Sequence, residues 1–82
     1  MAERLKAARQ RTVGTKQTLK AVERGTARVV FLAQDADERV LRDLVRRCTE
    51  NEIEIVYVES MAALGKACGI QVGAASAAII EG

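Results

Sequence analysis

The sequence predicts an α/β fold of three layers, α/β/α, with crossover connections between its strands. Short apolar runs typical of strands alternate with segments of about 10–15 residues that have helical periodicity. The run at residues 29–33 is apolar throughout, as in a central strand that is covered on both faces. Segments of this length suit crossovers between strands. A chain of 82 residues is expected to form one domain, so we expect a single domain over residues 1–82.

The N-terminal segment is predicted to be helical. Leu5 and Ala8 recur at helical spacing among good helix formers, which predicts a helix over residues 2–11. Thr12 and Val13 then form a short extended piece before a glycine. The first predicted helix is thereby separated from the next one.

A second helix is predicted over residues 15–24. Leu19 and Val22 mark its inner face, and Gly25 is the expected C-terminal stop. Thr15 is the predicted N-cap, because its hydroxyl can accept from a free amide of the first turn. The glycine before it allows the chain to turn sharply into the helix.

The apolar strand at residues 29–33 leads into the most regular helix of the sequence, predicted over residues 37–50. Asp35 or Asp37 can cap this helix, where a carboxylate suits the positive end of the helix dipole. Its inner face is formed by apolar residues at positions i, i+3, i+4 and i+7, namely Leu41, Leu44, Val45 and Cys48.

The C-terminal third is predicted to contain two strands around a short helix. Residues 53–58 form the first strand, and Ser60 caps a helix that runs to about Cys68. A glycine-containing loop follows at residues 69–73, and residues 74–80 form the last strand.

The composition excludes several classes of function. Without histidine, the chain lacks His-based acid–base catalysis and every Cys-His or Ser-His nucleophile. Cys48 and Cys68 are too few and too far apart for a zinc site, and we expect them to be buried, reduced thiols. No apolar stretch reaches the roughly 18–20 residues that span a bilayer, and the N-terminus lacks a signal-peptide core. We therefore expect a cytoplasmic protein that is not an enzyme, with no cofactor, metal or membrane partner.

Positive charge is concentrated in the first part of the chain. Residues 1–30 contain eight Lys/Arg and two Glu, a net charge of +6, whereas residues 31–82 carry −4, which together give the total of +2. Such asymmetry is typical of a surface that faces a polyanion. A basic but purely solvated helix surface is the alternative.

Three polar side chains are predicted to share one face of the second helix. Lys16 and Lys20 are i, i+4 neighbours, and Gln17 is three residues before Lys20. The free amides at the helix start attract anions beside them. Lysine and glutamine can hydrogen-bond base edges, and ammonium groups neutralise phosphates. The alternative is a solvated helix face.

The glycines near the C-terminus do not form a nucleotide-binding loop. Gly65, Gly69 and Gly73 lack the order of a Gly-x-Gly-x-x-Gly motif between a strand and a helix. They are expected to mark helix ends and a loop that approaches a ligand or backbone closely. Phe31 and Tyr57, the only aromatic residues, both fall on predicted strands. Without a stacking platform for single-stranded bases, RNA recognition would have to be polar and aimed at a preformed shape.

Several ordered motifs cover nearly the whole chain. They are Gly14-Thr15-Lys16-Gln17-Thr18-Leu19-Lys20 with Arg24-Gly25, Ala33-Gln34-Asp35-Ala36-Asp37, Val58-Glu59-Ser60-Met61, Leu64-Gly65-Lys66-Ala67-Cys68-Gly69-Ile70 and Gln71-Val72-Gly73-Ala74-Ala75. With these motifs the sequence resembles the kink-turn-binding ribosomal-protein family L-seven-Ae/L-thirty-e, most closely its small bacterial members of the YbxF type.

The resemblance implies a three-layer α-β-α sandwich around a four-stranded mixed sheet, with residues 12–13 supplying one strand. It also implies a partner: a structured RNA, from ribosomal RNA or a messenger leader, that contains a kink-turn, a bend stabilised by tandem sheared G·A pairs. Association with the ribosome and a monomeric state are further expectations. Carried over by position, the RNA-binding residues are Gly14, Thr15, Lys16, Gln17, Lys20 and Arg24, together with the loop residues Ile70, Gln71, Val72, Gly73 and Ala74.

The sequence departs from the family pattern at two of these positions. Lys16 stands where asparagine is usual, and Gln17 stands where glutamate is usual. Glutamate would accept charge-assisted bonds from guanine N–H groups, which are about twice as strong as neutral ones. We therefore expect binding that is weaker and more salt-dependent. The family proline after the Ala-x-Asp-Ala segment is also absent, with minor structural effect. The alternative function is a protein-interaction module of the translation apparatus without direct kink-turn recognition.

Overall fold

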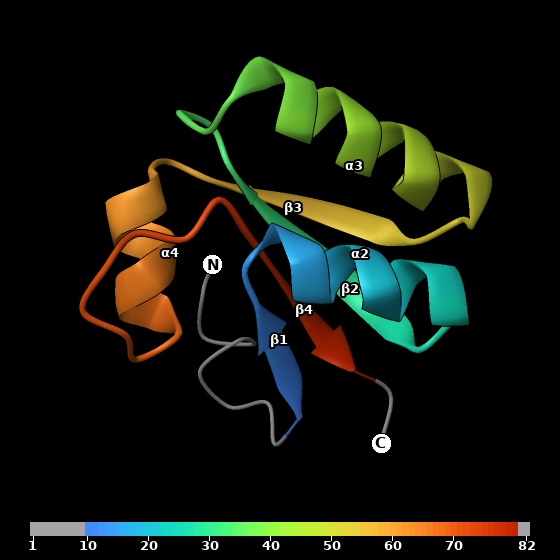
Figure 1. The fold of residues 1–82 in the computed structure, drawn as a ribbon, viewed down its shortest axis with the longest axis horizontal. Helices are drawn as coiled ribbons and strands as arrows, with labels where there is room; N and C mark the ends of the chain where they lie inside the picture. Colours follow the sequence, from blue (N-terminus) through green and yellow to red (C-terminus); the bar gives the residue numbers. More distant parts are fainter. Residues whose placement is uncertain (1–9, 81–82) are drawn as a thin grey trace.

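The computed structural model describes residues 10–80. No helix within this range is long and apolar enough to cross a membrane. The helix predicted over residues 2–11 lies outside the described residues except at its end, where Arg11 already belongs to a strand. The elements in chain order (Figure 1) are β1 (Arg11–Val13), α2 (Thr15–Arg24), β2 (Ala27–Ala33), α3 (Glu38–Glu50), β3 (Glu54–Val58), α4 (Met61–Ala67) and β4 (Ser76–Ile80).

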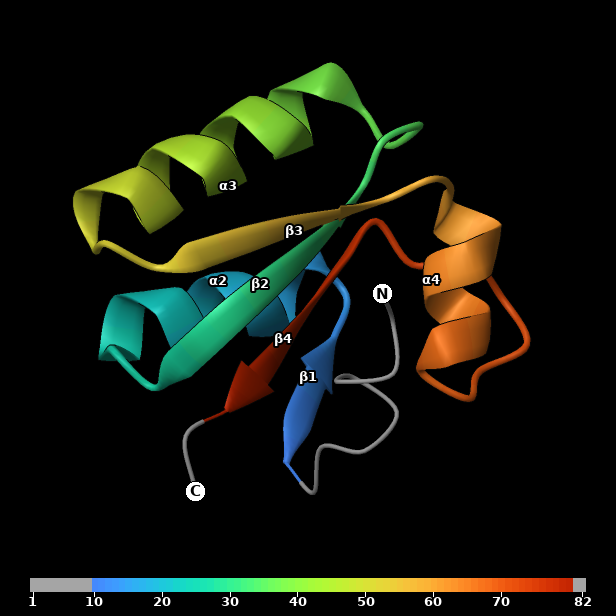
Figure 2. The same ribbon diagram turned by 180° about the vertical axis from the view of Figure 1, so that it is seen from behind.

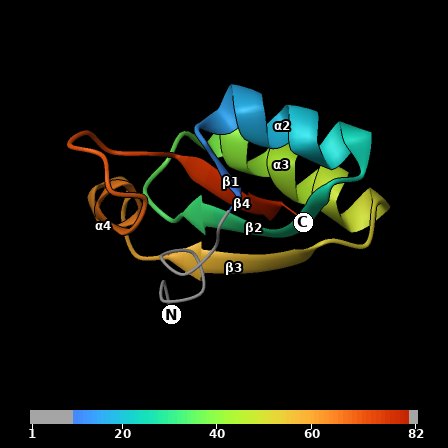
Figure 3. The ribbon, with the colours of Figure 1, turned by 90° about the horizontal axis from the view of Figure 1, so that it is seen from below.

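The strands form one four-stranded sheet in the order β1-β4-β2-β3. β2 and β3 are parallel and are joined through α3, whereas β4 runs antiparallel to both β1 and β2. Helices α2 and α3 lie together on one side of the sheet (Figure 3). The predicted three-layer α-β-α sandwich with a mixed sheet is therefore confirmed.

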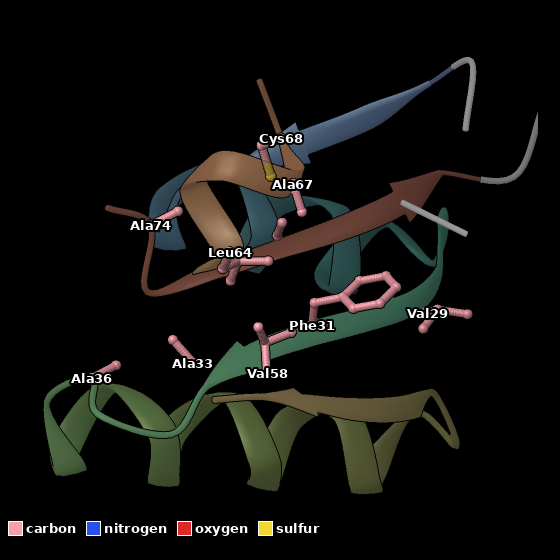
Figure 4. Close-up of a cluster of buried hydrophobic side chains, with 10 residues drawn as sticks. Val29, Phe31, Ala33, Ala36, Val58, Leu64, Ala67, Cys68 and Ala74 are labelled. Carbon is pink, nitrogen blue, oxygen red and sulfur yellow. The ribbon is translucent and has the colours of Figure 1, made fainter. Parts of the chain in front are cut away.

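The alternating side chains of β2 connect the two helical layers. Phe31, together with Val29 and Ala33, packs into a cluster with Leu64 of α4 (Figure 4). Val30 and Leu32 point to the opposite face, where they pack with side chains of α2 and α3. The strand is thus covered on both faces, as its apolar run predicted, and it begins two residues earlier, at Ala27.

Helix α2 has the predicted bounds but a different N-cap residue. Gly25 ends it in the left-handed conformation (φ 73°), and its amide donates to the carbonyl oxygens of Ala21 and Val22. The predicted N-cap Thr15 is wrong: Gly14 is the N-cap, and no side chain caps the first turn. The Thr15 hydroxyl instead lies 3.2 Å from the hydroxyl of buried Ser76. The Thr15 hydroxyl therefore makes a long-range contact with Ser76 and does not cap its own helix.

Helices α3 and α4 begin at side-chain caps. Asp37 accepts from the amide of Arg39 at 2.8 Å, whereas the other candidate, Asp35, accepts from the amide of Met61 at 2.7 Å. Ser60 caps α4 as predicted, because its hydroxyl oxygen accepts from the amide of Ala63 at 3.0 Å. Asp35 thereby links the end of β2 to the start of α4.

Both cysteines are buried, free thiols, as predicted. Burial raises the pKa of the Cys48 thiol, because the thiolate is disfavoured away from water. Burial also raises the pKa of Cys68, an effect that the Arg11 guanidinium partly offsets.

The last strand begins at Ser76 rather than at the predicted residue 74. The amide of Ala74 donates to the carbonyl oxygen of Met61 at 3.0 Å. Ala74 is therefore bonded to α4 and not to a neighbouring strand. The loop after α4 is therefore longer than predicted. It leads into β4 beside the start of α2 (Figures 1 and 2).

Candidate nucleic-acid interface

The outward face of α2 carries polar and cationic side chains. The helix buries Thr18, Ala21 and Val22 against the sheet, while Leu19 is half-buried. With that face inward, the helical period turns the opposite face to solvent. The exposed side chains that share this face are Lys16, Gln17, Lys20 and Arg24. The sequence-based grouping of Lys16, Gln17 and Lys20 on one exposed face is thus confirmed.

A shallow groove of about 300 Å³ runs along α2 where it meets the strands at the β1 edge of the sheet. Gln17, Lys20 and Arg24 supply an amide, an ammonium and a guanidinium to its α2 wall, whereas Lys16 does not line it. The other wall was missed by sequence reasoning, because it depends on the pairing of β1 with β4. The residues of that wall and of the groove floor are Thr12, Ala21, Thr26 and Ile80.

The start of α2 is an open, electropositive helix end. Gly14 has φ 95°, a conformation that L side chains rarely adopt, and its amide donates to the carbonyl oxygen of Ser76 at 2.8 Å. The first turn has no side-chain cap and no acidic residue. Its amides therefore remain available to an anion or an acceptor at the positive end of the helix dipole.

The loop between α4 and β4 is seated on two glycines. A Cβ at Gly65 would overlap the carbonyl oxygen of Val72, and a Cβ at Gly73 would lie 3.1 Å from the Cβ of Met61. These close approaches fix the loop against α4, as the glycine pattern indicated. The seated loop presents the Val72 side chain to solvent, with 71% of its surface exposed.

The predicted loop contacts differ in their accessibility. Gln71, Val72 and Gly73 are exposed, and Ile70 is half-buried. Ala74, however, is 95% buried, because it packs in the core cluster beneath the loop. The Ala74 side chain is therefore not on the surface, contrary to a role in direct contact.

Hydrogen bonds join the loop and the start of α2 into one surface. Ser76, the first residue after the loop in β4, holds both the Gly14 amide and the Thr15 hydroxyl. The amide of Ala33 donates to the carbonyl oxygen of Ala75 at 2.9 Å, which fixes the end of the loop to β2. The guanidinium of Arg11 donates to the carbonyl oxygen of Cys68 at 2.8 Å and ties β1 to the end of α4.

One carboxylate lies within the cationic face of α2, and it is paired. The Glu23 carboxylate accepts from Nη1 of Arg47 in α3 at 2.6 Å. The Arg47 Nε also donates to Asp43 at 3.2 Å, and this hydrogen bond is the main reason why the pKa of Arg47 is raised. The pairing reduces the repulsion that Glu23 would exert on an approaching anion. Within residues 10–80, no group of three or more metal-ligating side chains is close enough to hold a metal ion.

The family model described as the Ribosomal protein L7Ae/L30e/S12e/Gadd45 family matches residues 2–82. The chain belongs to this family, as its motifs indicated. It is 48% identical over 73 residues to "RNA-binding protein TTE2299" of Caldanaerobacter subterraneus subsp. tengcongensis, covering 89% of each chain. It is 46% identical over 77 residues to "RNA-binding protein BH0128" of Halalkalibacterium halodurans, covering 94% of each.

Solved structures share the fold. The "15.5kD RNA binding protein" of Giardia lamblia superposes with a TM-score of 0.81 at 33% identity, over 88% of this chain. This chain spans 61% of the Giardia chain. A protein of unknown function from Bacillus halodurans C also superposes with a TM-score of 0.81, at 28% identity, covering 98% of this chain and 77% of that one.

Proposed function

We propose that this protein binds RNA and recognises the kink-turn, stabilising the bent form of the RNA. The observation that carries the proposal is the combination of an uncapped helix start with three donor side chains, Gln17, Lys20 and Arg24, along one groove. Amide donors, an ammonium and a guanidinium suit guanine edges and phosphates. The names of the two relatives and of the Giardia structure, each an RNA-binding protein, support the proposal.

We assign each residue a role in RNA binding from its position relative to the groove. Gln17 and Lys20 read the guanines of the sheared G·A pairs, with the backbone of Gly14 and Thr15 approaching closely. Lys16 and Arg24 neutralise phosphates, since both are exposed cations, Arg24 in the wall of the groove and Lys16 outside it. The loop residues Ile70, Gln71, Val72 and Gly73 pack against nucleotides that the bend has unstacked.

The aromatic residues fit polar recognition. Phe31 is fully buried, and Tyr57 lies on β3, the edge strand farthest from β1 in the sheet. Neither one offers a stacking surface beside α2, so the RNA shape itself has to be recognised. A protein of this kind shifts the RNA toward the bent form only by its differential affinity for the two shapes.

The proposal also covers the oligomeric state of the protein, its location in the cell and its association with translation. The protein acts as a monomeric, single domain over residues 1–82, in the cytoplasm and in association with the ribosome or another component of translation. Its role is binding and not catalysis. Both ribosomal RNA and a messenger leader can carry the bent element.

A gel-shift titration with two RNAs tests the proposal. One RNA contains a kink-turn, and the other is a copy whose tandem G·A pairs are replaced by Watson–Crick pairs. We expect much tighter binding to the first RNA, because only this one presents the sheared guanines. Equal binding to both RNAs, or to neither, contradicts kink-turn recognition. Capture of a translation protein without any RNA affinity favours the protein-interaction alternative.

A further inference from the structure

A second cationic surface lies on α3, outside the groove along α2. Arg39, Arg42 and Arg46 are exposed and recur at i, i+3 and i+7, so they share the face of α3 that points away from the sheet. Together with Asp43 they line a shallow hollow of about 500 Å³. The opposite face of α3 buries Leu44 and Cys48, so packing fixes which way these arginines point.

The carboxylates of this surface are partly engaged. Asp43 accepts from Arg46 at 3.0 Å and from Arg47 at 3.2 Å. Among the side-chain hydrogen bonds and ion pairs of residues 10–80, none engages the guanidinium of Arg39 or Arg42. Glu38 lies in the first turn and lines a smaller hollow beside Arg42. Helix α3 therefore carries four guanidiniums against three carboxylates, those of Glu38, Asp43 and Glu50. The guanidiniums of Arg39 and Arg42 have donors free for an incoming anion.

We propose that the arginine stripe of α3 (Arg39, Arg42 and Arg46) is a second RNA contact, which binds the phosphate backbone of a stem that continues from the element held at α2. Guanidinium groups donate bidentately to phosphate oxygens, which suits a row of backbone phosphates. The hollow is too shallow to enclose a small ligand, since small-molecule sites bury most of the ligand surface. The inference rests on the proposed function and names the part of the RNA that reaches this face.

The placement of α3 supports a continuous RNA footprint. Helices α2 and α3 lie side by side on the same face of the sheet (Figure 3), and the Arg47–Glu23 ion pair joins their outer surfaces. Packed helices are about 8–10 Å apart. The outward side chains of α3 therefore lie close to the backbone of a stem that is seated on α2.

The test compares three kink-turn RNAs that differ only in stem length. The short RNA has stems just long enough to form the bend, and the long RNAs extend one or the other stem. We compare the parent protein with Arg39→Gln/Arg42→Gln, which leaves Arg46 in place because its guanidinium is hydrogen-bonded to Asp43. Arg28→Gln/Lys66→Gln is the control for net charge. It makes the same change in net charge at exposed positions of β2 and α4.

We expect the parent to bind one of the long RNAs on the order of 10-fold more tightly than the short RNA at low salt. Arg39→Gln/Arg42→Gln should remove this gain and reduce the salt slope for the long RNA by about two, as expected for two lost phosphate contacts. Its affinity for the short RNA should equal that of the parent. The control should retain the gain.

Two results would overturn the inference and leave the proposed function intact. In the first, the parent binds the short RNA specifically but gains nothing from either extension. In the second, the gain survives in Arg39→Gln/Arg42→Gln or is lost equally in the control. A parent that binds none of these RNAs overturns the proposed function as well. Far-UV circular dichroism melts of each variant establish that the fold is kept.

Discussion

The carbonyl oxygen of Val72 occupies the space that a Cβ at Gly65 would need, so the loop before β4 is seated on α4 only because residue 65 has no side chain. Gly65 also fixes the loop through its own carbonyl oxygen, which accepts from the amide of Ile70 at 3.0 Å. The exposure of the Val72 side chain follows from this seat, since the backbone faces α4 and the side chain faces solvent. A helix residue thereby sets the shape of a loop that we propose contacts RNA.

Gly65→Ala is expected to displace this loop. The overlap involves backbone, which cannot rotate away, so overpacking should lower the free energy of unfolding by about 1–3 kcal/mol. Affinity for a kink-turn RNA should fall with it, which a gel shift measures beside a urea melt. Ala62→Gly is the control, because it loses about 1 kcal/mol of helix propensity at an exposed position of the same helix. Equal loss of affinity in both variants would mean that stability, and not the loop, is responsible.

Lys20→Ala tests the groove directly. Lys20 lines the groove beside Gln17, where we propose that it donates to a guanine edge. Loss of such a contact should weaken kink-turn binding by about 1–3 kcal/mol. Binding to the RNA without G·A pairs should change little, because that RNA offers no matching contact. Affinity equal to that of the parent would place the interface elsewhere on the protein.

The secondary structure was largely predictable because it is set by local pattern. The bounds of α2 follow from its buried spacing and from Gly25, and the cap of α3 follows from Asp37. The errors arise where long-range contacts decide. Thr15 does not cap α2 because its hydroxyl meets Ser76, and residue 74 leaves the last strand because its amide meets Met61. Both partners are distant in the sequence.

The candidate site was likewise predictable where one helix determines it and not where distant segments meet. The shared face of Lys16, Gln17 and Lys20 is a property of one helix, so the i, i+4 rule predicts it. The groove needs the register of β1 on β4, in which Thr12 lies opposite Ala78, and no single segment encodes that pairing. The helical period places the arginines Arg39, Arg42 and Arg46 of α3 opposite its apolar positions. Their common hollow became apparent only with the helix placed on the sheet.

Lys16→Gln should improve stability while it weakens binding. Lys16 is a cation in the first turn of α2, where the helix dipole disfavours positive charge and no acidic residue compensates. Its removal should raise the free energy of unfolding by about 0.3–1 kcal/mol, measured by urea melts. RNA affinity should fall, with a salt slope lower by about one. Lys20→Gln, in the middle of the same helix, should weaken binding without this gain in stability. A destabilised Lys16→Gln would mean that the lysine has a structural role.

Gln17→Glu should restore the stronger acceptor that is usual in the family. A carboxylate accepts charge-assisted hydrogen bonds from guanine N–H groups, about twice as strong as those of an amide. The preference for the kink-turn RNA over its copy without G·A pairs should therefore increase, even though the added negative charge lowers non-specific binding. The ratio of the two dissociation constants measures this preference. A ratio that falls in Gln17→Glu would indicate that residue 17 faces phosphates and not guanines.

The buried thiol of Cys48 predicts a loss of stability in alkali. Burial raises its pKa above the ordinary value of 9.0, so the folded chain keeps a proton that the unfolded chain releases. The free energy of unfolding is therefore unaffected by this group below about pH 9 and falls as the pH rises above that value. Urea melts at about pH 8 and pH 10 should show a smaller loss for Cys48→Ala than for the parent. Other groups titrate equally in both proteins, so the difference between the two losses isolates this thiol. Identical losses would show that the thiolate of Cys48 is as well solvated in the folded chain as in the unfolded one.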